Sequence, residues 1–231
     1  MAADILGISS MATRQILAEL CGVYQKKTGR SVAFESVGGV DAARRVRSGE
    51  TFDVVVLADD VMKKLEADGF LKPASRTPFA ESAIAVAVRS GEKRPDLTSE
   101  ATTKAAVISA RSIGYSTGPS GTHVLKLMEK WGVDQSKAGK IVQAPPGVPV
   151  GSLVARGEVE LGFQQLSELL DVPGMEIAGP LPPEVQSVTL FVCGVGARAV
   201  NEARARDLIL YLASPETAGT KRRLGMEPPP R

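Results

Sequence analysis

Hydroxyl-bearing and glycine residues gather where apolar runs give way to helix-like patterns. The most marked case is the stretch GYSTGPSGTHVLKL, in which Ser116, Thr117, Ser120 and Gly121 precede an apolar helical pattern. Hydroxyls donate hydrogen bonds, and the first N–H groups of a helix have no partner within the helix. The positive end of the helix dipole lies at the same place, so this turn favours a small oxyanion or carboxylate.

Two more turns of this kind lie near the start of the chain. In ADILGISSM a strand runs into two serines that can cap the following helix. In FESVGGV a serine ends a strand and two glycines leave the backbone open to close approach by a ligand. An ordinary cap and an ordinary tight turn explain each motif equally well when it is taken alone. The candidate ligand residues of these turns are Ser9, Ser10, Met11, Ser36, Gly38 and Gly39.

Two further side-chain types suit an anionic ligand. Arg44 and Arg45 follow the second turn on the same predicted helix, and a guanidinium matches a carboxylate with two hydrogen bonds. We expect one of them, with Arg45 as the candidate, to reach a ligand at the start of the helix. The alternative is that both arginines face water. Gln164 ends a predicted strand, and strand ends border the binding crevice of open α/β sheets. A solvent-facing glutamine is the alternative.

Several catalytic classes are disfavoured by residue type and spacing. The chain has one histidine, His123, and neither CxxC nor HExxH, so we expect no metal and no cofactor. GPSGTH lacks the lysine and the spacing of a Walker A loop, and no acid is placed to complete a Ser-His-Asp triad. Cys21 and Cys193 lie in apolar stretches, the usual setting of buried free thiols, with a disulfide as the alternative.

The elements that must position these residues alternate between short β-like runs and helical patterns. The predicted strands are 4–8, 32–36, 53–57, 84–88, 112–115, 140–143, 161–164, 176–178 and 188–195. The predicted helices are 12–29, 40–48, 60–68, 99–110, 122–131, 151–157, 166–170, 201–213 and 215–224. This order predicts an α/β fold with mostly parallel sheets flanked by helices.

Two long apolar runs, IAVAV and SVTLFVCGVGA, flank the middle third of the chain. If both cross between two lobes, they form a hinge, and we expect the ligand in the cleft between the lobes. The predicted parts are lobe one at 1–82 and 196–231, lobe two at 90–187, and hinge strands at 83–89 and 188–195.

The charge balance disfavours large polyanionic partners. Lys and Arg number 28 against 26 Asp and Glu, so the net charge of +2 offers no broad basic surface for nucleic acid or an anionic membrane. No apolar run reaches the ~18 to 20 residues of a membrane span. The start MAAD is typical of a methionine placed on a mature chain after an A-x-A cleavage site. We therefore expect a periplasmic protein whose signal peptide is removed, with a cytoplasmic one as the alternative.

The order of the motifs resembles the type II periplasmic solute-binding proteins, specifically their molybdate-binding branch. The resemblance runs from SSM and FESVGG through GETFDVVVLADD and GYSTGPSG to VGSLVARGEVELGF and ARDLILYLASPETAGTKRRLGM. It implies a two-lobed hinged fold and a monomeric receptor of an ABC-type importer, whose permease would be a partner. By position it implies ligand contacts from Ser9 or Ser10, Ser36, the N–H groups around Ser120, the loop at Val148 and Gln164.

Some features depart from the molybdate-binding pattern. Those proteins use an uncharged cage with a tyrosine near the position of Gln164, whereas this chain has glutamine there and Arg44 and Arg45 on the second helix. His123 also lies beside the expected pocket. These differences favour an organic di- or tricarboxylate over molybdate or tungstate.

The chain also resembles aconitate isomerases, enzymes on the same fold that interconvert cis- and trans-aconitate. That proton shift alpha to a carboxylate needs a base and donors for the enolate-like charge, and no cofactor. His123 would then be the base, with Ser120 among the donors, and a structural histidine is the alternative. Binding of a small anion as an importer receptor is our leading prediction, and the isomerase is the second. A regulator effector domain ranks third, because no helix-turn-helix precedes Ile5.

Overall fold

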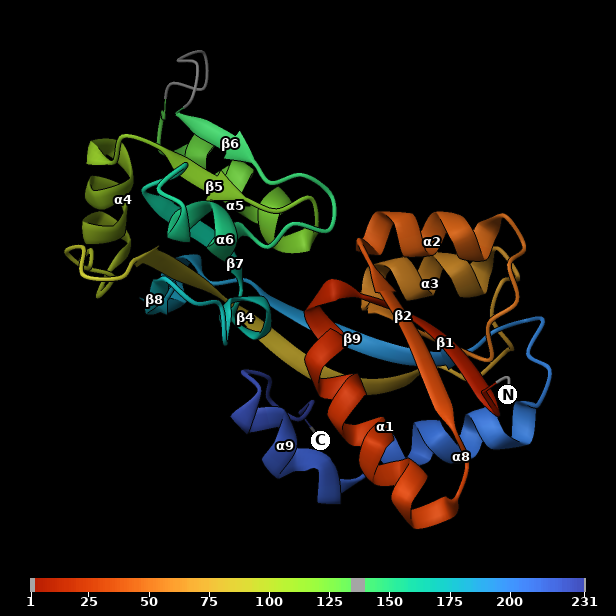
Figure 1. The fold of residues 1–231 in the computed structure, drawn as a ribbon. Coiled ribbons are helices and arrows are strands. Elements are labelled where there is room, and N and C mark those ends of the chain that lie inside the picture. The colour runs from red at the N-terminus through yellow and green to blue at the C-terminus, as the bar shows by residue number, and fades with distance from the viewer. Residues whose placement is uncertain (1–2, 134–139, 231) are drawn as a thin grey trace. The chain divides into compact units, whose positions relative to one another are not determined.

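The computed structural model describes residues 3–133 and 140–230 of the chain (Figure 1). It divides into two compact units, Met1–Ser82 with Thr189–Arg231, and Ala83–Val188. The chain thus passes between the units twice, once within strand β4 (Thr77–Arg89) and once at the start of strand β9 (Val188–Val195). Hinge motion at 83–89 and 188–195 stays a prediction.

The first unit is built on a sheet with the strand order β2-β1-β3-β9-β4. Besides β9 and the first part of β4, its strands are β1 (Ile5–Ser10), β2 (Val32–Val37) and β3 (Val54–Ala58). β1 pairs in parallel with β2 and with β3, whereas β9 runs antiparallel to β3. The helices of this unit are η1 (Met11–Thr13), α1 (Arg14–Thr28), α2 (Gly39–Arg47), α3 (Asp59–Ala67), α8 (Glu202–Ala213), η3 (Pro215–Thr217) and α9 (Ala218–Arg223).

Helices cover both faces of this sheet, and each face has its own core. α1 and α8 pack on one face around Ile16, Leu17 and Leu208, and α2 and α3 pack on the other around Val46 and Met62 (Figure 1). The strands between them are buried on both sides, which explains the almost continuous apolar run of β3.

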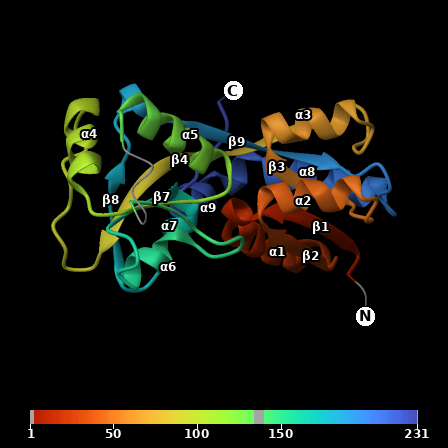
Figure 2. The same cartoon turned by 90° about the horizontal axis from the view of Figure 1, so that it is seen from above.

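The second unit has a smaller sheet made of the second part of β4 and four further strands, β5 (Ile113–Tyr115), β6 (Ile141–Gln143), β7 (Leu161–Gln165) and β8 (Met175–Pro180). β5 pairs in parallel with β6 and β7, and β4 is antiparallel to β7 and β8. Its helices are α4 (Glu100–Ser109), α5 (Pro119–Lys130), α6 (Val150–Ala155), α7 (Leu166–Leu169) and η2 (Pro183–Val185). α4 and α5 pack on one face of the sheet and α6 on the other, and Figure 2 shows α5 and α6 on the two sides of β7.

Local signals explain where several helices begin and end. Ser99 and Thr102 form a reciprocal capping box at the start of α4, and Asn201 caps α8. Pro119 occupies the first turn of α5, where a missing N–H costs nothing. α1 ends at Gly29, whose φ of +71° is the left-handed conformation that glycine adopts at least cost.

The α/β fold predicted from the alternation of elements is confirmed, and most boundaries agree within one or two residues. β4 differs most, since it begins at Thr77, well before the expected start at Ile84, and α5 begins at Pro119, three residues before the expected Thr122. Cys21 and Cys193 are buried and free, as the apolar stretches indicate, and burial raises the pKa of the Cys21 thiol to about 12. Over 3–133 and 140–230, no helix is long and apolar enough to cross a bilayer.

Candidate functional site

Each unit presents an edge at which parallel strands end and helices begin. In the first unit β1, β2 and β3 run in the same direction, and η1, α2 and α3 start directly after them or after a one-residue gap. Small anions bind at such edges because helix starts point N–H groups toward them. Three of the residues singled out in the sequence, Ser9, Ser10 and Ser36, lie on the last residues of β1 and β2.

Ser9 and Ser36 form one pair on this edge. They are register partners across β1 and β2, and their hydroxyl oxygens lie 2.9 Å apart. Ser9 is fully buried, while Ser36 is half-buried. The Ser9 hydroxyl also lies 3.3 Å from the Ser10 carbonyl oxygen, to which it donates, so Ser36 donates to Ser9 in this arrangement. A ligand that takes the Ser36 proton would compete with that bond.

Ser10 is the most informative residue of the edge. It caps η1 without a side-chain cap hydrogen bond, and its hydroxyl oxygen is buried with no hydrogen-bond partner among the described residues. A buried hydroxyl without a partner costs about 1–3 kcal/mol. Met11 follows it in η1 and is half-buried.

The two glycines complete the small-residue surroundings of Ser10. Gly38 caps α2 with no side chain to bond the first N–H groups, and a Cβ placed on Gly39 would lie 3.7 Å from the Cβ of Ser10. The start of the nine-residue helix α2 therefore lies beside the unpartnered hydroxyl. This arrangement can donate hydrogen bonds from N–H and hydroxyl groups to one small acceptor.

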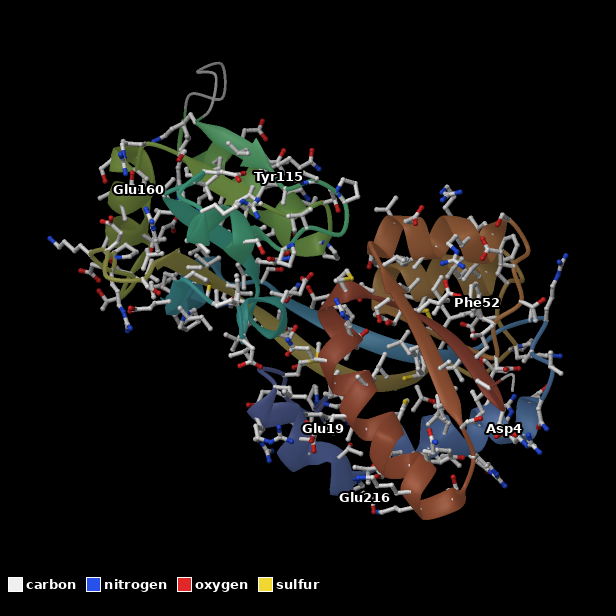
Figure 3. The ribbon with its side chains drawn as sticks, viewed as in Figure 1. Asp4, Glu19, Phe52, Tyr115, Glu160 and Glu216 are labelled. Atoms are coloured by element: carbon white, nitrogen blue, oxygen red, sulfur yellow. The ribbon has the colours of Figure 1, made fainter. Side chains whose placement is uncertain are left out.

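Arg45 does not join these residues. Its guanidinium binds Glu50 at 2.6 Å and Glu35 at 2.6 Å, and it lies over the Phe52 ring, 5.3 Å from the centroid; Phe52 is labelled in Figure 3. These partners lie toward the C-terminal end of α2, opposite to Gly39. Arg44 bonds Asp41 through Nε at 3.1 Å.

The second unit has a corresponding edge, formed by the ends of β5, β6 and β7. Tyr115, labelled in Figure 3, ends β5, and the STGPSG turn follows it. The hydroxyl oxygens of Ser116 and Ser120 lie 3.0 Å apart, Ser120 is buried, and Thr117 is exposed. A Cβ on Gly121 would lie 1.7 Å from the carbonyl oxygen of Ser116, so glycine is required for the turn to pack on α5.

His123 lies one helical turn after Ser120 and is half-buried. Its Nε2 is 2.8 Å from the carbonyl oxygen of Val185. Because a carbonyl can only accept, Nε2 is the donor of this hydrogen bond. The bond fixes the orientation of the ring.

Gln164 is 2% exposed and accepts a hydrogen bond from the backbone N–H of Val150 at 2.7 Å, through Oε1. That N–H belongs to the first residue of α6, two residues after the half-buried Val148. The Gln164 amide also hydrogen-bonds the carboxyl of Glu168 in α7, and burial raises the pKa of Glu168 to about 7. Sequence reasoning missed Glu168, since a glutamate in LSELL looks like an ordinary solvent-facing helix residue.

The predicted site residues therefore form two groups, one on the first unit and one on the second. Ser9, Ser10, Ser36 and Gly39 come together on the first, and Ser116 and Ser120 come together on the second. Within 3–133 and 140–230, no group of three His, Cys, Asp or Glu side chains is arranged to hold a metal ion.

Two proteins of known function are similar to this chain over most of its length. The chain is 34% identical over 229 residues to an aconitate isomerase of Pseudomonas sp., covering 96% of this chain and 87% of that protein. It is 23% identical over 215 residues to a molybdate-binding protein of Azotobacter vinelandii, covering 87% and 80% of the two chains.

Solved structures give the same fold. The periplasmic molybdate-binding protein of Azotobacter vinelandii matches with a TM-score of 0.78 at 22% identity, over 98% of this chain and 100% of that one. These matches confirm the resemblance to the molybdate-binding branch and the two-lobed fold class. Residues 5–227 match the family model described as bacterial extracellular solute-binding protein. The chain belongs to this family of bacterial extracellular solute-binding proteins.

Proposed function

We propose that this protein binds a small anion, an oxyanion or an organic polycarboxylate, as the periplasmic receptor of an ABC-type importer. The observation that carries the proposal is the Ser10 hydroxyl, buried and unpartnered beside the Ser9–Ser36 pair and the start of α2. An acceptor bound there would recover the cost of that unmade hydrogen bond.

The electrostatics favour an anion held by dipoles and hydroxyls. Arg45, the cation that the sequence offered as a ligand contact, is neutralised by Glu35 and Glu50. Fixed N–H and hydroxyl donors stabilise negative charge without a counter-cation, as they do at helix starts generally. The molybdate-binding relative supports an oxyanion, and the aconitate isomerase relative supports a tricarboxylate.

Isothermal titration with molybdate, sulfate, citrate and trans-aconitate tests the proposal. Ser10→Ala should weaken the tightest of these ligands roughly tenfold to 150-fold, because a hydrogen bond to a charged group contributes about 1.5–3 kcal/mol. Ser48→Ala, at an exposed serine that bonds the Arg45 carbonyl, is the matched control. Unchanged affinity in Ser10→Ala, or no binding of any of the four ligands, contradicts the proposal.

A second candidate function is the isomerisation of aconitate without a cofactor, favoured by the 34% identity to an aconitate isomerase over nearly the full chain. His123 would act through Nδ1, taking a proton from the carbon next to a carboxylate and returning it at the other end of the allylic system. Ser120 would donate to the developing negative charge.

The ultraviolet absorbance of trans-aconitate separates the two functions. An isomerase makes the absorbance drift, and His123→Gln abolishes the drift while the protein still binds. A flat trace with wild-type protein that binds trans-aconitate excludes turnover and leaves the receptor function.

A further inference from the structure

Glu168 differs from the other glutamates of the second unit whose pKa is shifted. Burial raises the pKa of Glu168, whereas the pKa is lowered in each of the others by an Arg or Lys partner. Those paired glutamates are Glu100, Glu158, Glu160 and Glu176. Glu168 is thus a carboxyl whose charge the surrounding chain does not compensate.

The position of Glu168 is set by the strand before it. It lies in α7, directly after β7, and β5, β6 and β7 run in parallel. α7 therefore begins at the same edge as the loop that contains Val148 and the turn that contains Ser116 and Ser120. Glu168 is half-buried as a residue, and its carboxyl is shielded enough from water for burial to raise its pKa.

Gln164 connects this carboxyl to the start of α6. Its Oε1 accepts from the Val150 N–H, which fixes the orientation of the side-chain amide. The NH₂ end is then left to donate, and Glu168 accepts from it. The chain of hydrogen bonds from Val150 through Gln164 to Glu168 lies within one unit and is buried at its centre.

No described charge stabilises the ionised form of Glu168. Among the elements that pack against α7, β7 has the sequence LGFQQ and α6 the sequence VGSLVA, and neither carries an ionisable residue. α7 also shares a core with β4 and β8, whose ionisable residues are Glu81, Arg89 and Glu176, and Glu176 is paired with Arg94. Burial and the Gln164 hydrogen bond are the influences on its pKa among the described residues. A second negative charge at this edge therefore raises the cost of ionising Glu168.

We propose that Glu168 takes up a proton when an anion binds at this edge, with Gln164 linking the carboxyl to the start of α6. The inference rests on the proposed function, adds to it an anion contact on the second unit beside the turn of Ser116 and Ser120, and gives the dependence of that contact on pH. It predicts tighter binding below neutral pH, because the protonated carboxyl does not repel the ligand. Each pKa unit by which the anion shifts Glu168 corresponds to a tenfold change in affinity across the titration.

The test is isothermal titration of wild-type protein and Glu168→Gln with trans-aconitate at pH 7, in two non-phosphate buffers of different ionisation enthalpy. The difference in buffer dependence between the proteins gives the protons taken up by Glu168 and cancels those of the ligand. We expect the wild type to take up as much as about half a proton more, because a carboxyl with a pKa of about 7 is half protonated at that pH.

One control variant separates Glu168 from the glutamates with cationic partners. Glu158→Gln, at an exposed glutamate paired with Arg156, should keep the wild-type uptake. A series from pH 5.5 to 9 with wild-type protein alone should give maximal uptake above pH 7, midway between the pKa values of the free and the anion-bound protein, and it serves as the readout if Glu168→Gln does not fold.

The possible outcomes distinguish a failure of this inference from a failure of the proposed function on which it rests. Equal proton uptake and equal pH dependence in wild type and Glu168→Gln, with both binding, overturn the role of Glu168 and leave anion binding intact. Loss of the uptake in Glu158→Gln also overturns it. Absence of trans-aconitate binding, repeated with molybdate, overturns the proposed function and the inference with it.

Discussion

Lys221 gives the sharpest quantitative prediction for the first unit. Its side chain on α9 is 1% exposed, its Nζ donates to the carbonyl oxygen of Leu212 at 2.8 Å, and it lies 4.9 Å from the centroid of the Phe79 ring. No carboxylate pairs with it in the described part of the chain. Removal from water disfavours the ammonium, and desolvation lowers the pKa of Lys221 from 10.5 to about 8.

The sign and size of the effect follow from linkage. Between pH 8 and 10.5 the unfolded chain holds this proton and the folded chain does not, so the free energy of unfolding rises with pH. At about 1.4 kcal/mol for each pKa unit, the full rise is about 3 kcal/mol, and below pH 8 the folded protein bears the whole cost of the buried charge.

Lys221→Met removes the amine and keeps an unbranched side chain of similar length. The lost hydrogen bond to Leu212 offsets part of the gain at neutral pH, so the diagnostic quantity is the dependence on pH. Wild-type protein should gain about 3 kcal/mol relative to Lys221→Met between pH 7 and 10.5. Urea unfolding followed by far-ultraviolet circular dichroism at several pH values measures this difference.

Lys63→Met is the matched control, because Lys63 is exposed and pairs with Asp59 on the surface. It should reproduce the wild-type pH dependence. Parallel curves for wild type and Lys221→Met from pH 7 to 10.5 would refute the reasoning, since they would mean that burial does not perturb this lysine.

Two other predictions concern the candidate site. Gly121→Ala should lower the free energy of unfolding by about 2 kcal/mol or more, because its Cβ would meet the Ser116 carbonyl oxygen. Gly118→Ala, at a glycine with open space around it, should be nearly neutral, and thermal unfolding compares the pair. Arg45→Met should leave the affinity for trans-aconitate within about twofold of wild type, because both glutamate partners hold the guanidinium at the far end of α2. A loss of tenfold or more in titration would show that Arg45 reaches the ligand.

The strands that the sequence predicts well are those whose apolar run is uninterrupted, such as β3 and β9. β4 begins earlier than its apolar run because Pro78, Glu81 and Ser82 break the pattern over its first half. The first half of β4 is held by pairing with strands that are distant in the chain. Such pairing cannot be recognised from the neighbouring residues in the sequence. The antiparallel direction of β9 against β3 has the same origin.

The serine and glycine turns were predictable because turn chemistry is local. A serine at a strand end and a glycine at a helix start satisfy requirements set by a few neighbouring residues. Partners from elsewhere in the chain were not predictable. Val185 fixes His123 from 62 positions away, and Val150 fixes Gln164 across a strand and a helix.

The local sequence around Arg45 does not reveal which residues its guanidinium binds. The alternation of side chains along β2 nevertheless explains them. Successive side chains of a strand point to opposite faces of the sheet, so Glu35 and Ser36 on β2 cannot contact the same neighbours. Ser36 meets Ser9, and Glu35 meets Arg45 of α2 on the other face. With the guanidinium neutralised there, hydroxyl and N–H dipoles are left to face an anion beside Ser10. Dipoles fixed by the fold select an acceptor by geometry, whereas a free cation attracts any negative charge, so the alternation along β2 favours a ligand recognised by its shape.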